Sequence, residues 1–164
     1  MDAEAMTGKV YLICGMICSG KSTLAERLSL QNRAAILSCD ELTKALGDDL
    51  GDLHDAIAAR IHVYLQNKAV ALCRLGVNVI LEWGFWRAAD RAEISRFLSD
   101  SGVPFEWHYM DVAPDRLARN IASRNARPGP CDYIVDQGLL DKCRAAFEPP
   151  VAGEMDVVHT SANC

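Results

Sequence analysis

One stretch restricts what this chain can fold into more than any other: Gly15-Met16-Ile17-Cys18-Ser19-Gly20-Lys21-Ser22. It matches the phosphate-binding motif G-x-x-x-x-G-K-[ST], known as Walker A, at every fixed position. The apolar run from Val10 to Cys14 predicts a strand before it, and the sequence from Thr23 to Gln31 predicts an amphipathic helix after it. Because the motif stands in this strand–loop–helix context, we expect a nucleotide-binding loop.

The spacing of the motif suits the binding of anions. Glycine lets the backbone curl so that several N–H groups point at a phosphate chain, and the helix behind the loop adds the positive end of its dipole. Lys21 is expected to reach the β- and γ-phosphates, and the Ser22 hydroxyl to bind Mg²⁺. The residues expected to contact the nucleotide are Gly15, Cys18, Ser19, Gly20, Lys21, Ser22 and Thr23.

The composition indicates a globular protein with a single domain, residues 1–164. Of its 164 residues, 50% are hydrophobic and 24% are charged, which is typical of a chain with a packed core. The formal net charge of −5 does not favour nucleic acid or a membrane surface as a partner, and no apolar run approaches the roughly 20 residues of a membrane span. The N-terminus lacks a signal-peptide pattern, so we expect a cytoplasmic protein whose residues 1–8 form a flexible leader.

The cysteines favour reduced thiols. The chain has seven, an odd number without a C-x-x-C pair, which argues against disulfides and against a zinc site. Cys18 stands apart because it lies inside the phosphate loop. There it is either an activated thiol or only a small loop residue, and both interpretations stay open.

Five predicted strands alternate with helices along the chain. Such alternation indicates an α/β fold with a parallel sheet, right-handed crossovers and helices on both faces. After the first strand, strands are predicted at 34–38, 77–81, 105–110 and 155–159. After the first helix, helices are predicted from about residue 41, over 53–72, and at 88–99, 115–125 and 136–147.

Two carboxylates follow predicted strands, at the sheet edge where open α/β folds bind ligands. Asp40 follows the second strand and is a candidate general base for an acceptor hydroxyl. The alternative is that Ser38 or Asp40 only caps the next helix. Glu82 follows the third strand, where a Walker B type acid orients Mg²⁺ directly or through water. Ser22 and Glu82 are therefore the candidate metal ligands.

The segment after Glu82 is rich in aromatic residues. Trp83, Phe85 and Trp86 are candidates for lining an acceptor pocket, and Arg87 is a candidate for holding a substrate or a phosphate. Packing in the core explains each aromatic residue equally well, so both interpretations stay open.

Arginines gather in the helix predicted after Pro114. In a chain of negative net charge they suggest a lid that closes over the phosphates and neutralises their charge; the alternative is a solvated helix face. The sequence from Arg127 to Pro130 favours a mobile loop, so the lid region is expected at 124–136. The arginines concerned are Arg116, Arg119, Arg124 and Arg127.

Together, these motifs make the chain resemble the small P-loop kinases of the AAA-domain or predicted-kinase group. It is similar to chloramphenicol phosphotransferase, zeta toxin and the kinase domain of polynucleotide kinase over nearly its whole length. The resemblance implies a three-layer P-loop NTPase fold, ATP and Mg²⁺ as cofactors, and an arginine-bearing lid. It implies Asp40 as general base and places Glu82 where members often carry Asp. It also implies Arg119 and Arg124 as lid arginines that act with Lys21 in catalysis.

Three functions are compatible with these residues. The first is an ATP-dependent phosphotransferase that moves the γ-phosphoryl group to a hydroxyl of a small molecule, either a metabolite or an antibiotic. The second keeps this chemistry but takes a polynucleotide 5′-hydroxyl or a nucleotide-sugar as acceptor, and the negative net charge disfavours nucleic acid. The third is a non-catalytic ATP-binding regulatory module. A GTPase is not expected, because Asn67-Lys68-Ala69-Val70 lacks the final Asp of N-K-x-D.

Overall fold

The computed structural model describes residues 7–47, 53–129 and 134–160. Residues 1–6 of the expected leader and 130–133 of the expected lid region lie outside the described residues. The strands are β1 (Val10–Gly15), β2 (Ala34–Ser38), β3 (Asn78–Glu82), β4 (Phe105–Asp111) and β5 (Val157–Thr160). The helices are α1 (Lys21–Asn32), α2 (Cys39–Leu46), α3 (His54–Arg74), α4 (Ala88–Asp100), α5 (Pro114–Ala126) and α6 (Gln137–Ala146).

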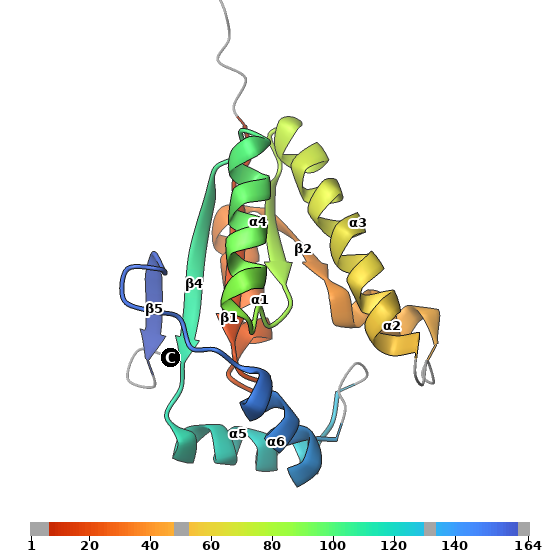
Figure 1. The fold of residues 1–164 in the computed structure, drawn as a ribbon, viewed down its shortest axis with the longest axis vertical. Coiled ribbons are helices and arrows are strands. Elements are labelled where there is room, and N and C mark those ends of the chain that lie inside the picture. The colour runs from red at the N-terminus through yellow and green to blue at the C-terminus, as the bar shows by residue number, and fades with distance from the viewer. Residues whose placement is uncertain (1–6, 48–52, 130–133, 161–164) are drawn as a thin grey trace, which may run out of the picture.

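All neighbouring strands of the sheet run parallel, in the order β2-β3-β1-β4-β5 (Figure 1). β1 takes the centre because it is apolar throughout, and all 6 of its residues are buried. Such a strand needs cover on both faces. The predicted α/β class with a five-stranded parallel sheet is therefore confirmed.

Helices cover both faces of the sheet and complete three layers. On one face, Tyr11 and Ile13 of β1 pack against α1. On the other, Val10, Leu12 and Cys14 pack against α3 and α4. Alternate residues of β1 thus enter opposite cores, as the two-residue period of a strand requires. None of the described helices has the length and apolar character needed to cross a membrane.

Most element boundaries differ by one or two residues from those predicted; β5, for example, is Val157–Thr160 instead of 155–159. Two of the differences concern the site. β3 begins at Asn78 instead of residue 77, because the Val77 N–H still donates to Leu72 O in the turn after α3. β3 also ends one residue later than predicted, so Glu82 is its last residue instead of the residue after it. α2 begins two residues before the expected start, since Ser38 serves as its N-cap.

The register of the sheet brings the site elements to one edge. Ser38 at the end of β2 pairs with Glu82 of β3, and Ile13, just before the phosphate loop, pairs with the same residue. The carboxyl ends of β1, β2 and β3 are thus level. α5 and α6 lie beyond this edge (Figure 1), where they can border a ligand bound there.

A polar cluster occupies the side of the sheet formed by β4 and β5. His108 Nδ1 lies 2.9 Å from His159 Nε2, and His108 Nε2 lies 2.9 Å from Glu106 Oε1. Lys9 Nζ donates to Glu106 Oε2 at 2.5 Å. Burial lowers the pKa of both histidines. Both imidazoles are therefore neutral in the folded protein near pH 7.

Candidate active site

The phosphate loop curls through two positions in the left-handed backbone region. Gly20 has φ of 96° and Cys18 has φ of 59°. The Ser19 N–H closes the turn by donating to Met16 O at 3.2 Å. A Cβ on Gly15 would lie 2.7 Å from Ser19 Oγ, so this position needs glycine. The loop thus takes the curled form that a phosphate cradle requires.

Lys21 opens α1, and its side chain folds back over the loop. Its Nζ donates to Met16 O at 2.7 Å and to Gly15 O at 3.1 Å. Burial lowers the pKa of Lys21, and the negative charges of Glu82 and Asp40 oppose this. The ammonium group therefore lies where it would meet phosphates held by the loop.

Ser22 and Glu82 form a pair of oxygen ligands beside the loop. Ser22 Oγ donates to Glu82 Oε1 at 2.6 Å. Burial raises the pKa of Glu82 and the charge of Asp40 adds to the rise, whereas the hydrogen bond from Ser22 and the charge of Lys21 act against it. Mg²⁺ prefers hard oxygen ligands and takes only one or two of them from carboxylates, so this pair fits it.

Ser19 gives a further sign that the loop is built for a ligand. Its side chain is buried, and no hydrogen-bond partner for Oγ exists among the described residues. Leaving a buried polar atom without a partner costs about 1–3 kcal/mol, which a bound phosphate would offset. The loop residues therefore suit a polyphosphate, with Ser22 and Glu82 placed to hold its metal ion.

Asp40 lies in the first turn of α2, exposed to solvent. The helix is capped by Ser38, whose Oγ accepts a hydrogen bond from the Glu41 N–H at 3.3 Å. Asp40 is therefore not needed as a cap. Asp40 lines the same cleft as Lys21 and Glu82, and its negative charge raises the pKa of both groups.

The segment after β3 is hydrogen-bonded to the residue that begins the phosphate loop. Trp86 Nε1 donates to Gly15 O at 3.2 Å, and the Gly15 N–H donates to Gly84 O at 3.2 Å. Gly84 is required at its position, because a Cβ there would lie 2.2 Å from Trp86 Nε1. The nucleotide loop and the aromatic segment thus form one connected structure.

All three aromatic residues border the cleft, and Phe85 also belongs to the core. Phe85 is 4% exposed and meets Trp107 edge-on, with 5.0 Å between ring centroids, so core packing accounts for it. Its φ of 48° is unusual for a bulky residue and costs energy that the surrounding contacts offset. Trp83, Trp86 and Arg87 are more exposed and line the cleft beside the loop.

A buried arginine holds this segment in place, and sequence reasoning missed its role. Arg91 is 1% exposed, and it continues the apolar stripe of α4 formed by Ile94 and Leu98. An arginine at core spacing was the signal that could have revealed it. It donates to the backbone oxygens of Phe85, Trp86 and Glu148, at 3.0, 3.3 and 3.0 Å, and pairs with the Glu154 carboxylate.

α5 meets the phosphate loop through one of its faces. Asn120 Nδ2 donates to Cys18 O at 3.0 Å, and Arg124 Nη1 donates to Cys18 Sγ at 3.3 Å. Arg119 lies on another face, where it is exposed and pairs with Asp115 at 3.1 Å. The structure therefore brings Arg124 to the site and does not bring Arg119 there.

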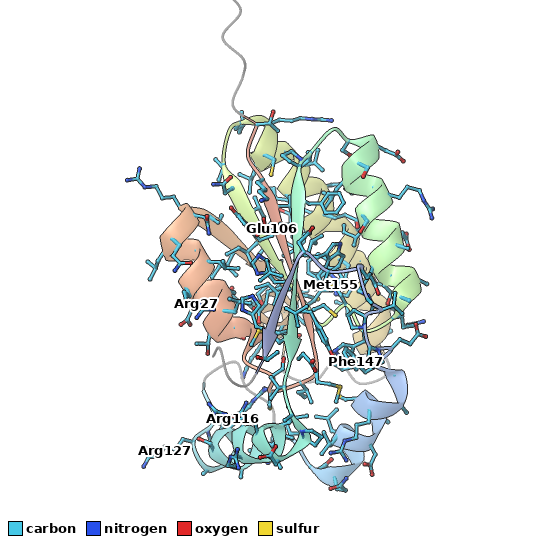
Figure 2. All side chains as sticks on the ribbon, turned by 90° about the vertical axis from the view of Figure 1, so that its left-hand side faces the viewer. Arg27, Glu106, Arg116, Arg127, Phe147 and Met155 are labelled. Carbon is cyan, nitrogen blue, oxygen red and sulfur yellow. The ribbon has the colours of Figure 1, made fainter. Side chains whose placement is uncertain are left out.

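The phosphate loop, the segment after β3 and the Arg124 face of α5 all line one open cleft of about 1850 Å³. On the side of α5, the cleft is lined by Arg124 and also by Arg116 and Arg127. Figure 2 shows Arg116 and Arg127 beyond the edge of the sheet. On the opposite side, α2 and α3 contribute Asp40 and His62. The loop residues Cys18 to Thr23 form the part between the two sides.

His62 is a site residue that sequence reasoning did not find. Its ring stacks on Trp83, with 4.6 Å between centroids and 17° between planes. A second histidine, His54, lies eight positions before it on the same helix, and this spacing did not indicate a role for His62 in the site. The pair of rings forms a wall of the cleft next to Asp40.

Comparison with known proteins agrees with this geometry. The family model AAA_33, described as an AAA domain, matches residues 10–150, so the chain belongs to that family. A search among curated proteins finds no match. Among solved structures, the APS kinase CysC of Mycobacterium tuberculosis, in complex with AMPPNP and APS, is 25% identical with a TM-score of 0.65. The match covers 94% of this chain and 89% of that chain.

Two further structures resemble the chain in fold. A gluconokinase from Sinorhizobium meliloti 1021 is 14% identical with a TM-score of 0.64, over 97% of this chain and 85% of that chain. A chain of the Pnkp1/Rnl/Hen1 RNA repair complex is 18% identical with a TM-score of 0.65, over 90% of this chain and 48% of that chain. The chain therefore has the three-layer fold of the P-loop NTPases and belongs with the small P-loop kinases. Family and neighbours support nucleotide binding and phosphotransfer in general.

Proposed function

We propose that the protein is an ATP-dependent phosphotransferase that uses Mg²⁺ and takes a hydroxyl group of a small molecule as acceptor. The observation that supports this most is the meeting of Lys21, Glu82 and Asp40 at one end of neighbouring strands, facing one cleft. A cradle for phosphates, a pair of metal ligands and a base are the parts that phosphoryl transfer needs.

Each residue then has a part in one transfer step. Asp40 accepts the proton of the acceptor hydroxyl. The hydroxyl oxygen forms a bond to the γ-phosphorus while the bond from that phosphorus to the β–γ bridging oxygen breaks, and ADP leaves. Lys21 and Arg124 stabilise the negative charge on the transferred group. When bound by Ser22 and Glu82, Mg²⁺ supplies further neutralisation of the phosphates.

The test combines purified protein with ATP, Mg²⁺ and a library of hydroxyl compounds, and mass spectrometry detects the gain of one phosphoryl group. With the acceptor found, Asp40→Asn should lower kcat by about 10²–10⁴-fold, because the general base is lost. The Kd for ATP should stay unchanged. Asp100→Asn, an exposed carboxylate at the far end of α4, is the control. Transfer by Asp40→Asn near the wild-type rate would contradict the proposal.

The same assay separates the two other functions. A polynucleotide 5′-hydroxyl kinase would lose activity steeply as salt rises, because contacts to many phosphates release counterions. A non-catalytic module would bind ATP tightly and phosphorylate nothing across a wide panel of acceptors.

A further inference from the structure

The two sides of the cleft carry opposite charge. The side of α5 is positive through Arg116, Arg124 and Arg127. The other side, which we call the acceptor side, is formed by α2, α3 and the first turns of α4. If the nucleotide lies on the loop beneath the arginines, the second substrate meets the acceptor side.

Carboxylates dominate the acceptor side. Asp90 and Glu93 stand three positions apart on α4, so they lie on the same face of that helix. Among the described residues of the acceptor side that line the cleft, Arg87 is the one arginine or lysine, and its Nε already lies 3.6 Å from Asp90 Oδ2. Lys44, Arg60 and Arg91 belong to the same helices but do not line the cleft. The lining of the acceptor side thus carries four carboxylates, Asp40, Glu41, Asp90 and Glu93, against this one guanidinium, a formal charge of −3.

His62 does not neutralise this charge. It lies on α3 between α2 and α4, and the carboxylates of both Asp40 and Asp90 act on its titration. Burial is the larger influence and lowers the pKa of His62, so the imidazole is neutral near pH 7. Stacked on Trp83, it offers flat, uncharged surface beside the carboxylates.

We propose that the phosphate acceptor is a positively charged hydroxyl compound, an amino alcohol or an amino sugar. Its ammonium group would lie against Asp90 and Glu93, its carbon skeleton against His62, and its hydroxyl toward Asp40. An acceptor that carries a carboxylate or sulfate would be repelled by the same groups, which is how charge excludes wrong partners. This inference rests on the proposed phosphotransferase function and narrows its substrate class.

Two matched sets of compounds test the charge preference. Each set keeps the carbon skeleton and differs at one substituent: glucosamine, glucose and glucuronate in one, and serinol, glycerol and glycerate in the other. The cationic member carries an ammonium group in place of the 2-hydroxyl, and the anionic member carries a carboxylate in place of one primary alcohol group. With ATP and Mg²⁺, we expect kcat/KM for the cationic member to exceed that for the neutral member by about tenfold, and the anionic member to react least. Asp90→Asn combined with Glu93→Gln should remove most of this preference, whereas Asp100→Asn on the same helix should keep it.

A second measurement does not depend on finding a good acceptor. The fluorescence of Trp83, taken as the difference between the wild type and Trp83→Phe, is quenched by Cs⁺ and by I⁻ in parallel titrations. A negative acceptor side predicts stronger quenching by Cs⁺, and the Asp90 and Glu93 substitutions should bring the two quenching constants together.

The outcomes distinguish this inference from the proposed function. Faster phosphorylation of glucuronate or glycerate than of the amines would overturn the inference and leave a phosphotransferase. Stronger quenching by I⁻ than by Cs⁺ would overturn it as well, even if none of the six compounds reacts. Failure of every compound in the wider library, with ATP bound, would overturn the phosphotransferase itself.

Discussion

Burial of the Glu82 carboxylate lowers the free energy of unfolding of the ligand-free protein. Burial raises its pKa above the ordinary value of 4.5, so the ionised form is disfavoured inside the fold. The folded state therefore holds this proton at pH values where the unfolded state has lost it. The free energy of unfolding falls as pH rises from about 4.5 through the pKa of the folded state.

Glu82→Gln should therefore stabilise the protein near pH 7. The amide keeps an oxygen for the Ser22 hydrogen bond but carries no charge to bury. Calorimetry should show Tm higher than the wild type by a few degrees at pH 7 and equal to it near pH 4, where the carboxyl is protonated in both states. Glu93→Gln, at an exposed position in the middle of α4, should leave Tm unchanged at both pH values. The same Tm for Glu82→Gln and the wild type at pH 7 would show that burial of this charge costs nothing.

At the scale of elements, α5 acts through the face that carries Asn120 and Arg124. Both side chains reach Cys18 in the phosphate loop, so this face is tied to the nucleotide site. Arg119 and its partner Asp115 lie on a solvent-exposed face. Two arginines of one helix thus differ in what they can contribute.

Arg124→Ala should lower kcat by about 10²–10³-fold, the effect of removing one charge-stabilising donor from a transition state. Arg119→Ala should change kcat less than about twofold, because an exposed ion pair contributes little. Steady-state kinetics with the acceptor at saturation would measure both. Equal losses in the two variants would show that α5 moves as a whole and presents Arg119 to the phosphates.

The histidines of β4 and β5 should make the protein less stable as pH falls below neutral. The pKa values of His108 and His159 lie below the ordinary 6.5 because of burial, so the unfolded state binds protons first as pH falls. The contribution of these two neutral histidines to the free energy of unfolding is fully present above pH 6.5. It falls as pH drops toward the lowered pKa values. Glu106 and Lys9 also face this cluster and set its electrostatics.

His159→Asn should flatten the loss of stability between pH 7 and pH 5. Urea unfolding at several pH values would measure the slope for both proteins. His62 contributes a slope of the same sign in wild type and variant, so the difference between the two reports the β4–β5 cluster. If the free energy of unfolding depended on pH equally in the wild type and the variant, unfolding would not change the protonation of the histidine pair.

For the whole molecule, a bound nucleotide should raise thermal stability by linkage. A ligand at 100 times its Kd adds about 2.7 kcal/mol, which is roughly 5–10 °C in Tm for a domain of this size. Differential scanning fluorimetry with AMPPNP and Mg²⁺ would measure it. EDTA should remove part of the shift, and Lys21→Met should remove most of it. A shift that survives Lys21→Met would place the nucleotide elsewhere.

Much of the fold and part of the site could be predicted because they depend on local patterns. Apolar runs between helices define the sheet, and the loop matches a motif. Asp40 lies two residues after the end of β2, and Glu82 ends β3. The core spacing of Arg91 could have indicated its burial, but the partners of Arg91 and His62 could not be predicted, because they come from distant segments: Glu154 lies 63 residues from Arg91. Arg124 and Arg119 are about 140° apart around an ideal helix, and only the three-dimensional position of the loop decides between them.

Arg91 joins parts of the chain that are made at different times. The carbonyl groups of Phe85 and Trp86 leave the ribosome with it, whereas Glu148 and Glu154 follow 57 and 63 residues later. A single domain generally folds as one unit. A chain interrupted before residue 148 would contain the whole phosphate loop but would lack the oxygen atoms that Glu148 and Glu154 offer to Arg91. The segment from Gly84 to Arg87 would then lack part of the contact that fixes it beside the cleft.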